Sequence, residues 1–132
     1  MRVVIPGGTG QVGTVLARAF HAAGHEVVIL SRRPEAAPWR VVEWDGQRAG
    51  PWTSELEGAD AVINLAGRSV NCRYTRSNRR AILSSRVTST EAVGLAISRA
   101  QRPRKTWLQM STATIYAHRF DAPPERLRRR RV

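Results

Sequence analysis

The sequence contains one cysteine, Cys72, and one lysine, Lys105, among its 132 residues. A single cysteine cannot form an internal disulfide and is typical of a reducing compartment, so we expect a soluble, cytoplasmic protein. No apolar run approaches the roughly 18 residues that a membrane span needs. The first residues enter a strand pattern directly, without the pattern of a signal peptide. These absences exclude a disulfide-stapled scaffold and give no indication of a membrane protein.

Acidic residues are also scarce, with 10 Asp and Glu against 22 Lys and Arg, which gives a formal net charge of +12. Nearly all of the basic residues are arginine, as a GC-rich genome would produce. The charge is therefore weak support for a function that depends on positive charge. The basic stretch from Arg68 to Lys105 has a single aromatic residue, Tyr74, and therefore no platform on which bases could stack. Nucleic acid is thus an unfavoured alternative partner, and we predict no metal site.

The first thirteen residues contain the most informative pattern in the chain. An apolar run at residues 3–5 is typical of a buried parallel strand. The glycines Gly7, Gly10 and Gly13 permit a tight turn and close approach of a pyrophosphate to the backbone. Apolar residues then recur at helical spacing: Val12, Leu16, Ala19, Phe20 and Ala23. Strand, phosphate loop and helix together predict dinucleotide binding, and the alternative is a glycine-rich turn in an α/β domain without nucleotide.

A second buried strand is predicted at residues 26–30, after Gly24 has ended the first helix. Dinucleotide folds that prefer NAD have an acidic residue at the end of this strand, whereas here Ser31 is followed by Arg32 and Arg33. A guanidinium can bind a phosphate through two hydrogen bonds, and a hydroxyl can add a donor. We therefore predict binding of NADP through its 2′-phosphate. NAD remains an alternative cofactor, and a solvated arginine pair is the alternative role.

Residues 34–58 give a weaker pattern, with a short strand at 40–44 and a helical turn around 53–56. The stretch holds three of the four tryptophans, Trp39, Trp44 and Trp52. These rings could wall an adenine site, but hydrophobic cover over the edge of the sheet is the favoured interpretation.

Later segments complete an α/β pattern, with a buried strand at residues 60–67, a long helix at 77–100 and a fifth strand at 103–110. Because right-handed crossovers leave few arrangements, we predict a Rossmann-type, doubly wound parallel sheet in the order 3-2-1-4-5. Ligands bind at the carboxyl ends of such strands, which places Asn64, Ala66 and Gly67 near the cofactor. For Asn64, a polar side chain satisfied within the sheet is an equal alternative.

Side chains of the long helix separate into two groups. One face holds residues that recur every three or four positions: Leu83, Val87, Thr90, Gly94 and Ile97. The remaining small residues would let another helix pack closely: Ser84, Ser85, Ser89, Ala92 and Ala96. The fifth strand has Trp107, Leu108 and Met110 as its apolar members.

Four motifs carry a resemblance to a known family. The loop G-G-T-G-Q-V-G at residues 7–13 resembles that of the extended short-chain dehydrogenases, the NAD-dependent epimerase/dehydratase family. The N-L-A-G of residues 64–67, the pair Ser85 and Arg86, and S-T-A-T-I-Y at 111–116 resemble its epimerase family protein subgroup, the 39U type. The resemblance runs from Met1 to about Pro123.

The resemblance implies an NADP-binding domain of an oxidoreductase or sugar-nucleotide epimerase. A catalytic hydroxyl would come from Thr112, with Ser111 and Thr114 beside it, and a homodimer would form through the 77–100 helix. The substrate site would lie mostly in a C-terminal region. The residues predicted to bind the cofactor are Gly7, Thr9, Gly10, Gln11, Val12, Gly13, Ser31, Arg32, Arg33, Asn64, Ala66 and Gly67.

One part of the family's chemistry is missing from the sequence. The family uses a tyrosine four residues before a lysine, but Asn78 follows Tyr74 at that spacing and Phe120 follows Tyr116. His118 is the nearest substitute acid, although a solvated loop residue is the favoured interpretation. We therefore expect this chain alone to be inactive, and a non-catalytic nucleotide-binding or redox-sensing module is the alternative function.

The last residues change character. We assign residues 1–121 to the Rossmann domain and 122–132 to a disordered tail rich in proline and arginine. Such a tail would arise from a frameshift or an early stop, and a basic arm for RNA or a membrane surface is the alternative.

Overall fold

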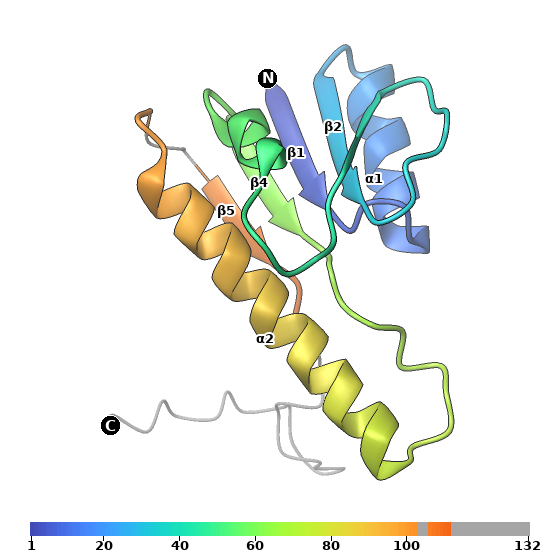
Figure 1. The fold of residues 1–132 in the computed structure, drawn as a ribbon. Coiled ribbons are helices and arrows are strands. Elements are labelled where there is room, and N and C mark those ends of the chain that lie inside the picture. Colours follow the sequence, from blue (N-terminus) through green and yellow to red (C-terminus); the bar gives the residue numbers. More distant parts are fainter. Residues whose placement is uncertain (103–105, 112–132) are drawn as a thin grey trace, which may run out of the picture.

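The computed structural model describes residues 1–102 and 106–111. Its five strands form one parallel sheet in the order β3-β2-β1-β4-β5, with helices on both sides (Figure 1). The predicted fold and strand order are therefore confirmed. The elements are β1 (Arg2–Pro6), α1 (Gln11–Ala22), β2 (Glu26–Ser31), β3 (Arg40–Glu43), the 3₁₀ helix η1 (Pro51–Leu56), β4 (Ala61–Asn64), α2 (Arg76–Arg99) and β5 (Thr106–Gln109).

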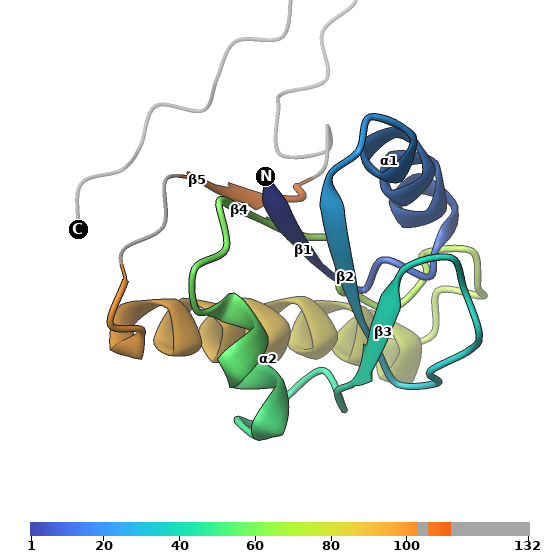
Figure 2. The same ribbon diagram turned by 90° about the horizontal axis from the view of Figure 1, so that it is seen from above.

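The central strand β1 is buried on both faces, as its apolar run predicts. Val3 pairs with Val27 of β2 on one side and with Ala61 of β4 on the other. Alternate residues then point to opposite layers, because side chains of a strand alternate between faces. Val4 packs toward α2 and η1, whereas Val3 and Ile5 pack toward α1. Figure 2 shows the two helical layers on either side of the sheet.

Two of the three middle tryptophans belong to the core. Trp44 and Trp52 are buried with ring centroids 4.9 Å apart. Both indole N–H groups donate to the carbonyl oxygen of Arg48, at 3.2 and 2.8 Å. Trp39 lies on the opposite face of the sheet, where it packs with the α1 layer. Trp44 and Trp52 thus belong to the core on one face of the sheet and Trp39 packs on the other, as the favoured interpretation of hydrophobic cover predicts.

The first helix buries a narrower face than its apolar spacing predicts. Gly13 and Ala17 are buried, Leu16 and Phe20 are half-buried, and Val12 is 50% exposed. Ala19 and Ala23, which belong to the same apolar spacing, are exposed too. The helix meets the sheet through its smallest residues, which lets it approach closely. The helix ends as predicted, with Gly24 at φ +78°.

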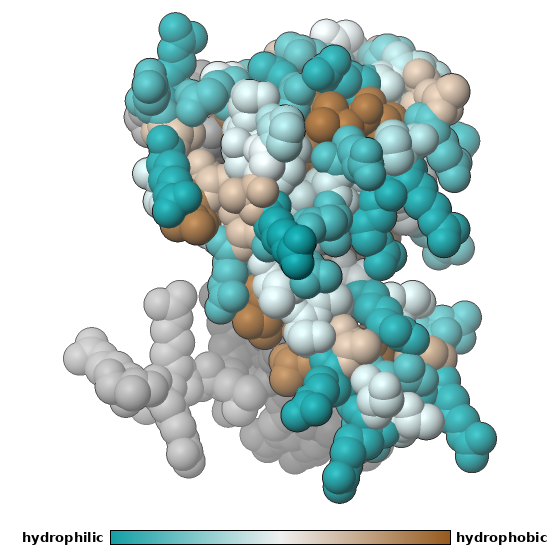
Figure 3. All heavy atoms as spheres, in the orientation of Figure 1, coloured by the Kyte–Doolittle hydropathy of each residue, from teal (hydrophilic) through white to brown (hydrophobic). Residues whose placement is uncertain are grey.

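The long helix α2 also turns a different face to the sheet. Small side chains expected to face another helix, including Ser89, Ala92 and Ala96, are buried against the sheet. Leu83 and Val87 from the predicted apolar face are 65% and 45% exposed. The amino-terminal part of α2 extends past the ends of the strands (Figure 1). Figure 3 shows apolar atoms interrupted by polar ones along the line of this helix.

The fifth strand is an exposed edge. It pairs with β4 from Ala61–Thr106 to Asn64–Gln109, and all four of its residues are exposed. Leu108 and Met110, predicted as apolar members of a strand, are 53% and 39% exposed. The predicted start at Pro103 lies outside the described residues. No helix in the described ranges is long and apolar enough to cross a membrane.

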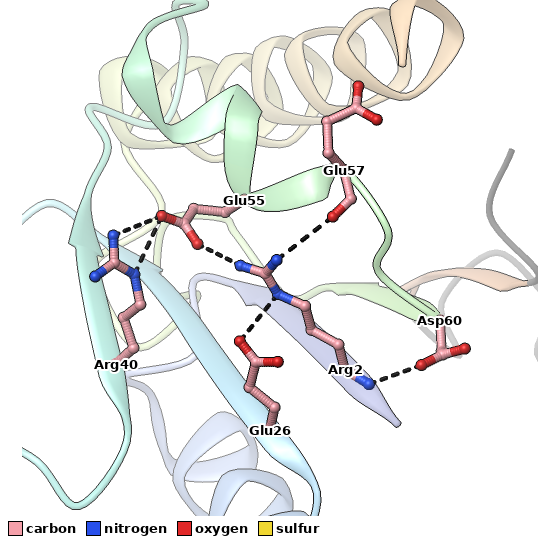
Figure 4. A network of polar contacts seen from close by, with 6 residues as sticks. All are labelled: Arg2, Glu26, Arg40, Glu55, Glu57 and Asp60. Atoms are coloured by element: carbon pink, nitrogen blue, oxygen red, sulfur yellow. Dashed lines mark hydrogen bonds and ion pairs between the residues drawn. The ribbon is translucent and has the colours of Figure 1, made fainter. Parts of the chain in front are cut away.

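A charged network closes the amino ends of the strands (Figure 4). The buried carboxylate of Glu55 accepts a 2.6 Å hydrogen bond from Arg2 Nη2 and a 2.7 Å hydrogen bond from Arg40 Nη2. Arg2 Nε lies 3.2 Å from Glu26 Oε1, and the Arg2 amide donates to Asp60 Oδ2 at 2.8 Å. The hydrogen bonds that Arg40 donates to the Glu55 carboxylate raise the pKa of Arg40 above its ordinary value. The network joins β1, β2, β3 and η1.

We predict that Glu55→Ala lowers the free energy of unfolding by about 1–3 kcal/mol, because Arg2 loses its main partner in a partly buried place. Urea denaturation followed by tryptophan fluorescence measures this loss. Glu35→Ala is the control, since Glu35 is exposed and has no ion pair with the described residues. Equal stability of the two variants would mean that the network is only a set of solvated pairs.

Candidate cofactor site

The loop between β1 and α1 lies at the carboxyl edge of the sheet and is bonded to β2 and to its own strand β1. The Gly7 amide donates to the Leu30 carbonyl at 2.8 Å, and the Gly8 amide donates to the Ile5 carbonyl at 3.1 Å. Gly7 has φ +75°, and a Cβ built there would lie 2.6 Å from the Ala66 Cα. Conformation and close approach both require glycine at this position.

The amino end of α1 is open to an anion. Gly10 is the N-cap and supplies no side chain to bond the first turn, which contains no acidic residue. Among the described residues, the amides of Gln11, Val12 and Gly13 have no hydrogen-bond partner. Free amides and the helix dipole together favour a negative group at this end.

The glycines of the loop differ in what surrounds them. A Cβ on Gly13 would lie 2.4 Å from the Gly8 Cα and carbonyl oxygen, so Gly13 allows the helix to pack on the loop. A Cβ on Gly10 would meet only the Gly7 carbonyl oxygen, at 3.9 Å. Gly10 therefore faces open space, where a ligand phosphate could approach the backbone.

At the end of β2, two arginines follow a hydrogen-bonded turn. The Ser31 hydroxyl donates to the Arg33 carbonyl at 3.1 Å and accepts from the Arg33 amide at 3.2 Å. Thr9 Oγ1 lies 3.4 Å from Ser31 Oγ, which connects this turn to the glycine loop. The side chains of Arg32 and Arg33 are exposed and have no polar partner among the residues that the structure describes.

The end of β4 lies directly beside the glycine loop. The Leu65 amide donates to the Pro6 carbonyl at 2.9 Å, which continues the pairing of β4 with β1. The buried Asn64 side chain donates to Gln109 Oε1 at 2.9 Å and accepts from the Ala66 amide at 3.1 Å. Sequence analysis missed Gln109, whose place opposite Asn64 follows only from the register of β4 and β5.

The structure brings the ends of β1, β2 and β4 together at one edge of the sheet, and the predicted residues in the described ranges lie at these strand ends, in the loops that follow them or at the start of α1. Ser111 follows β5 and is exposed. Outside the described residues lie Thr112, Thr114, Tyr116 and His118, and so does the predicted tail.

Across residues 1–102 and 106–111, no group of three or more His, Cys, Asp and Glu side chains could hold a metal. A pocket of about 170 Å³ between η1 and α2, lined in part by Thr53, Leu95 and Arg99, contains none of the predicted residues.

Comparison with known proteins gives a family. Residues 3–129 match the model of the NAD dependent epimerase/dehydratase family. The chain belongs to this family. The match extends a few residues past Pro123, where the resemblance in the motifs was expected to end.

Individual relatives agree with the epimerase family protein subgroup. Epimerase family protein SDR39U1 of Homo sapiens is 35% identical over 119 residues, which is 88% of this chain and 38% of that protein. Epimerase family protein YfhF of Bacillus subtilis is 37% identical over 119 residues, covering 88% and 39% of the two chains. The predicted resemblance is therefore confirmed.

A solved structure extends the comparison to three dimensions. The crystal structure of the human protein SDR39U1 (isoform 2) with NADPH matches with a TM-score of 0.78 and 32% identity. The match covers 92% of this chain and 40% of the human chain. This epimerase/dehydratase family chain thus has the nucleotide-binding fold of the extended short-chain dehydrogenases and spans about two fifths of its relatives' length.

We predict that Gly10→Val retains the fold of this family member but weakens dinucleotide binding by roughly ten- to hundredfold. The added side chain meets open space in the protein, yet it occupies the place from which a phosphate would reach the α1 amides. Circular dichroism measures the fold, and titration of NADPH by its fluorescence measures binding.

Gly13→Ala is the contrasting variant. Its methyl group would lie 2.4 Å from backbone atoms of Gly8, so this change should lower the melting temperature. Normal NADPH binding by folded Gly10→Val would show that the phosphates lie elsewhere.

Proposed function

We propose that the chain is the NADP-binding domain of an oxidoreductase or epimerase of the extended short-chain dehydrogenase type. The observation that carries the proposal is the open amino end of α1. There the N-cap is a glycine, and the three amides that follow it have no hydrogen-bond partner in the part of the chain that the structure describes. The residues Gly7, Thr9, Gly10, Gln11, Val12 and Gly13 would surround the pyrophosphate. Backbone amides and a helix dipole provide the chemistry that such a group requires.

The end of β2 supports NADP over NAD. Arg32 and Arg33 bring two guanidinium groups without polar partners in the described part of the chain to the corner where the adenosine ribose would lie. Ser31 would hold the turn that carries them, because its hydroxyl is bonded within that turn. The human relative, which was crystallised with NADPH, adds support for the phosphorylated cofactor.

The end of β4 would form the other wall of the cofactor site. Ala66 and Gly67 would line the path of the dinucleotide through their backbone, since they lie beside the glycine loop. Asn64 would act as a positioning residue, because its buried side chain bonds the Ala66 amide. NADP would supply hydride transfer at its nicotinamide ring. Thr112, or Ser111 beside it, would hydrogen-bond the substrate oxygen.

A second function remains an alternative. The sequence has no tyrosine with a lysine four residues later, so the chain lacks the family's usual proton-transfer pair. A non-catalytic nucleotide-binding or redox-sensing module would need only the cofactor site. The two functions differ in whether hydride transfer accompanies binding.

Two further expectations also remain proposals. A homodimer through the 77–100 helix would cover the exposed side chains of Leu83, Val87 and Leu95, and sedimentation velocity would detect it. The cytoplasmic location rests on cysteine usage alone, and localisation of the tagged protein would test it.

We predict that the chain binds NADPH roughly ten- to hundredfold more tightly than NADH. The reason is that NADH lacks the 2′-phosphate, whose charge-assisted contact contributes about 1.5–3 kcal/mol. Fluorescence titration of both cofactors measures the ratio. Arg32→Ala should reduce it, while Arg18→Ala, which removes an exposed arginine from α1, should not. Equal affinities of the wild type for the two cofactors would contradict the assignment to NADP.

We also predict only trace reductase activity for the 132-residue chain with NADPH, because a general acid or base contributes typically about 10²–10⁴-fold. NADPH oxidation would be followed at saturating cofactor against carbonyl compounds and sugar nucleotides. Robust turnover that disappears in Thr112→Ala or His118→Ala would show that the missing pair is not needed.

A further inference from the structure

Arg86 reaches from the middle of α2 onto the loop that follows β4. A Cβ built on Gly67 would lie 3.0 Å from Arg86 Nη1 and 3.2 Å from its Cζ. The guanidinium group therefore rests directly on the Gly67 backbone, where a larger residue would displace it. Gly67 was predicted to border the cofactor, so the cation stands beside the candidate site.

Two neighbouring serines hold this contact in place. Ser85 Oγ accepts from the Arg68 amide at 2.9 Å, and Ser89 Oγ donates to the Ala66 carbonyl at 3.4 Å. These bonds tie α2 to the loop on either side of Arg86. The backbone beneath the guanidinium is thereby fixed, and a group on a fixed backbone needs little reorganisation to bind a ligand.

The guanidinium group of Arg86 has no polar partner within the described ranges. Other arginines do have one: the half-buried Arg2 and the exposed Arg40 bond Glu55, and the exposed Arg68 donates through Nη2 to Asn78 Oδ1 at 3.0 Å. Arg86 is half-buried, yet no hydrogen bond or ion pair of its side chain is found among those residues. The loop at residues 65–75 contains no acid, and α2 contains only the exposed Glu91.

The location gives the cation access to a ligand. Ala66, one residue before Gly67, is the residue that a Cβ on Gly7 would strike at 2.6 Å. The loop beneath Arg86 is thus in backbone contact with the phosphate loop, at the carboxyl ends of β1 and β4. In open α/β sheets, ligands occupy the crevice at this edge.

We propose that Arg86 binds an oxyanion of the ligand in this crevice. A planar guanidinium binds phosphate or carboxylate through paired hydrogen bonds, which a lysine cannot reproduce. The oxyanion belongs either to the pyrophosphate of the dinucleotide or to an anionic substrate beside it. The place of the crevice rests on the proposed cofactor site, whereas the anion affinity of Arg86 can be measured separately.

The test compares Arg86→Gln with Arg80→Gln in the full 132-residue chain. Both changes remove one positive charge from α2, but Arg80 is exposed and has no polar partner in the part of the chain that the structure describes. Glutamine keeps much of the stem that packs on Gly67. Melting curves confirm that both variants fold.

NADPH titration is the first measurement. If the dinucleotide supplies the oxyanion, Arg86→Gln weakens NADPH binding roughly ten- to hundredfold, Arg86→Lys recovers part of the affinity, and Arg80→Gln changes it less than about twofold. If the oxyanion belongs to a substrate, NADPH affinity is unchanged. Calorimetric titration of the NADPH-saturated chain with pyrophosphate or malonate then detects binding that Arg86→Gln abolishes.

The outcomes separate this proposal from the proposed function. Indistinguishable behaviour of Arg86→Gln and Arg80→Gln in every titration overturns the role of Arg86. If the wild type binds neither NADPH nor NADH, the proposed cofactor fails instead. Pyrophosphate titration of the chain without cofactor then decides whether Arg86 binds an anion.

Discussion

The carboxyl edge of the sheet depends on backbone pairing that continues past the ends of the parallel strands. The Gly7 amide bonds the Leu30 carbonyl, and the Leu65 amide bonds the Pro6 carbonyl. The Met110 amide bonds the Asn64 carbonyl in the same manner. Each strand continues until this last bond and only then turns into its loop. The loops after β1, β2, β4 and β5 therefore begin side by side at the carboxyl edge of the sheet. The glycine loop is thereby placed against Ala66, and no side chain separates the two backbones.

The two ends of the sheet differ in how far their polar groups are satisfied. At the amino end, Glu55 bonds two arginines, and Asp60 receives the Arg2 amide. At the carboxyl end, the α1 amides and the guanidinium of Arg32 have no partner in the described part of the chain. A polar group that is bonded only to water can exchange that water for a ligand without breaking a hydrogen bond within the protein, so the free-energy cost is modest. The charged network stabilises the fold at the amino end, and the groups left without partners lie at the carboxyl end, where the cofactor site is proposed.

The sequence was sufficient for the fold and for the loop, because these rest on local rules. A buried run such as residues 3–5 and glycines between strand and helix specify strand, turn and helix within about twenty residues. The face of α2 could not be predicted, since contact with the sheet selects Ala92 and Ala96 over the larger Leu83. The partner of Asn64 and the contact of Arg86 with Gly67 join residues 45 and 19 positions apart, and only tertiary register brings them together.

The pairing of Val3 with Ala61 also has a consequence for the order of synthesis. The β1–α1–β2 unit, with its glycine loop, is complete once Ser31 has left the ribosome. The other neighbour of β1 is absent until β4 emerges, because Ala61 comes 58 positions after Val3 (61 − 3). Until then one edge of β1 carries unpaired backbone groups, which are a site for wrong pairing during translation. The strand at the centre of the finished sheet is thus an edge strand until β4 has been synthesised and pairs with it.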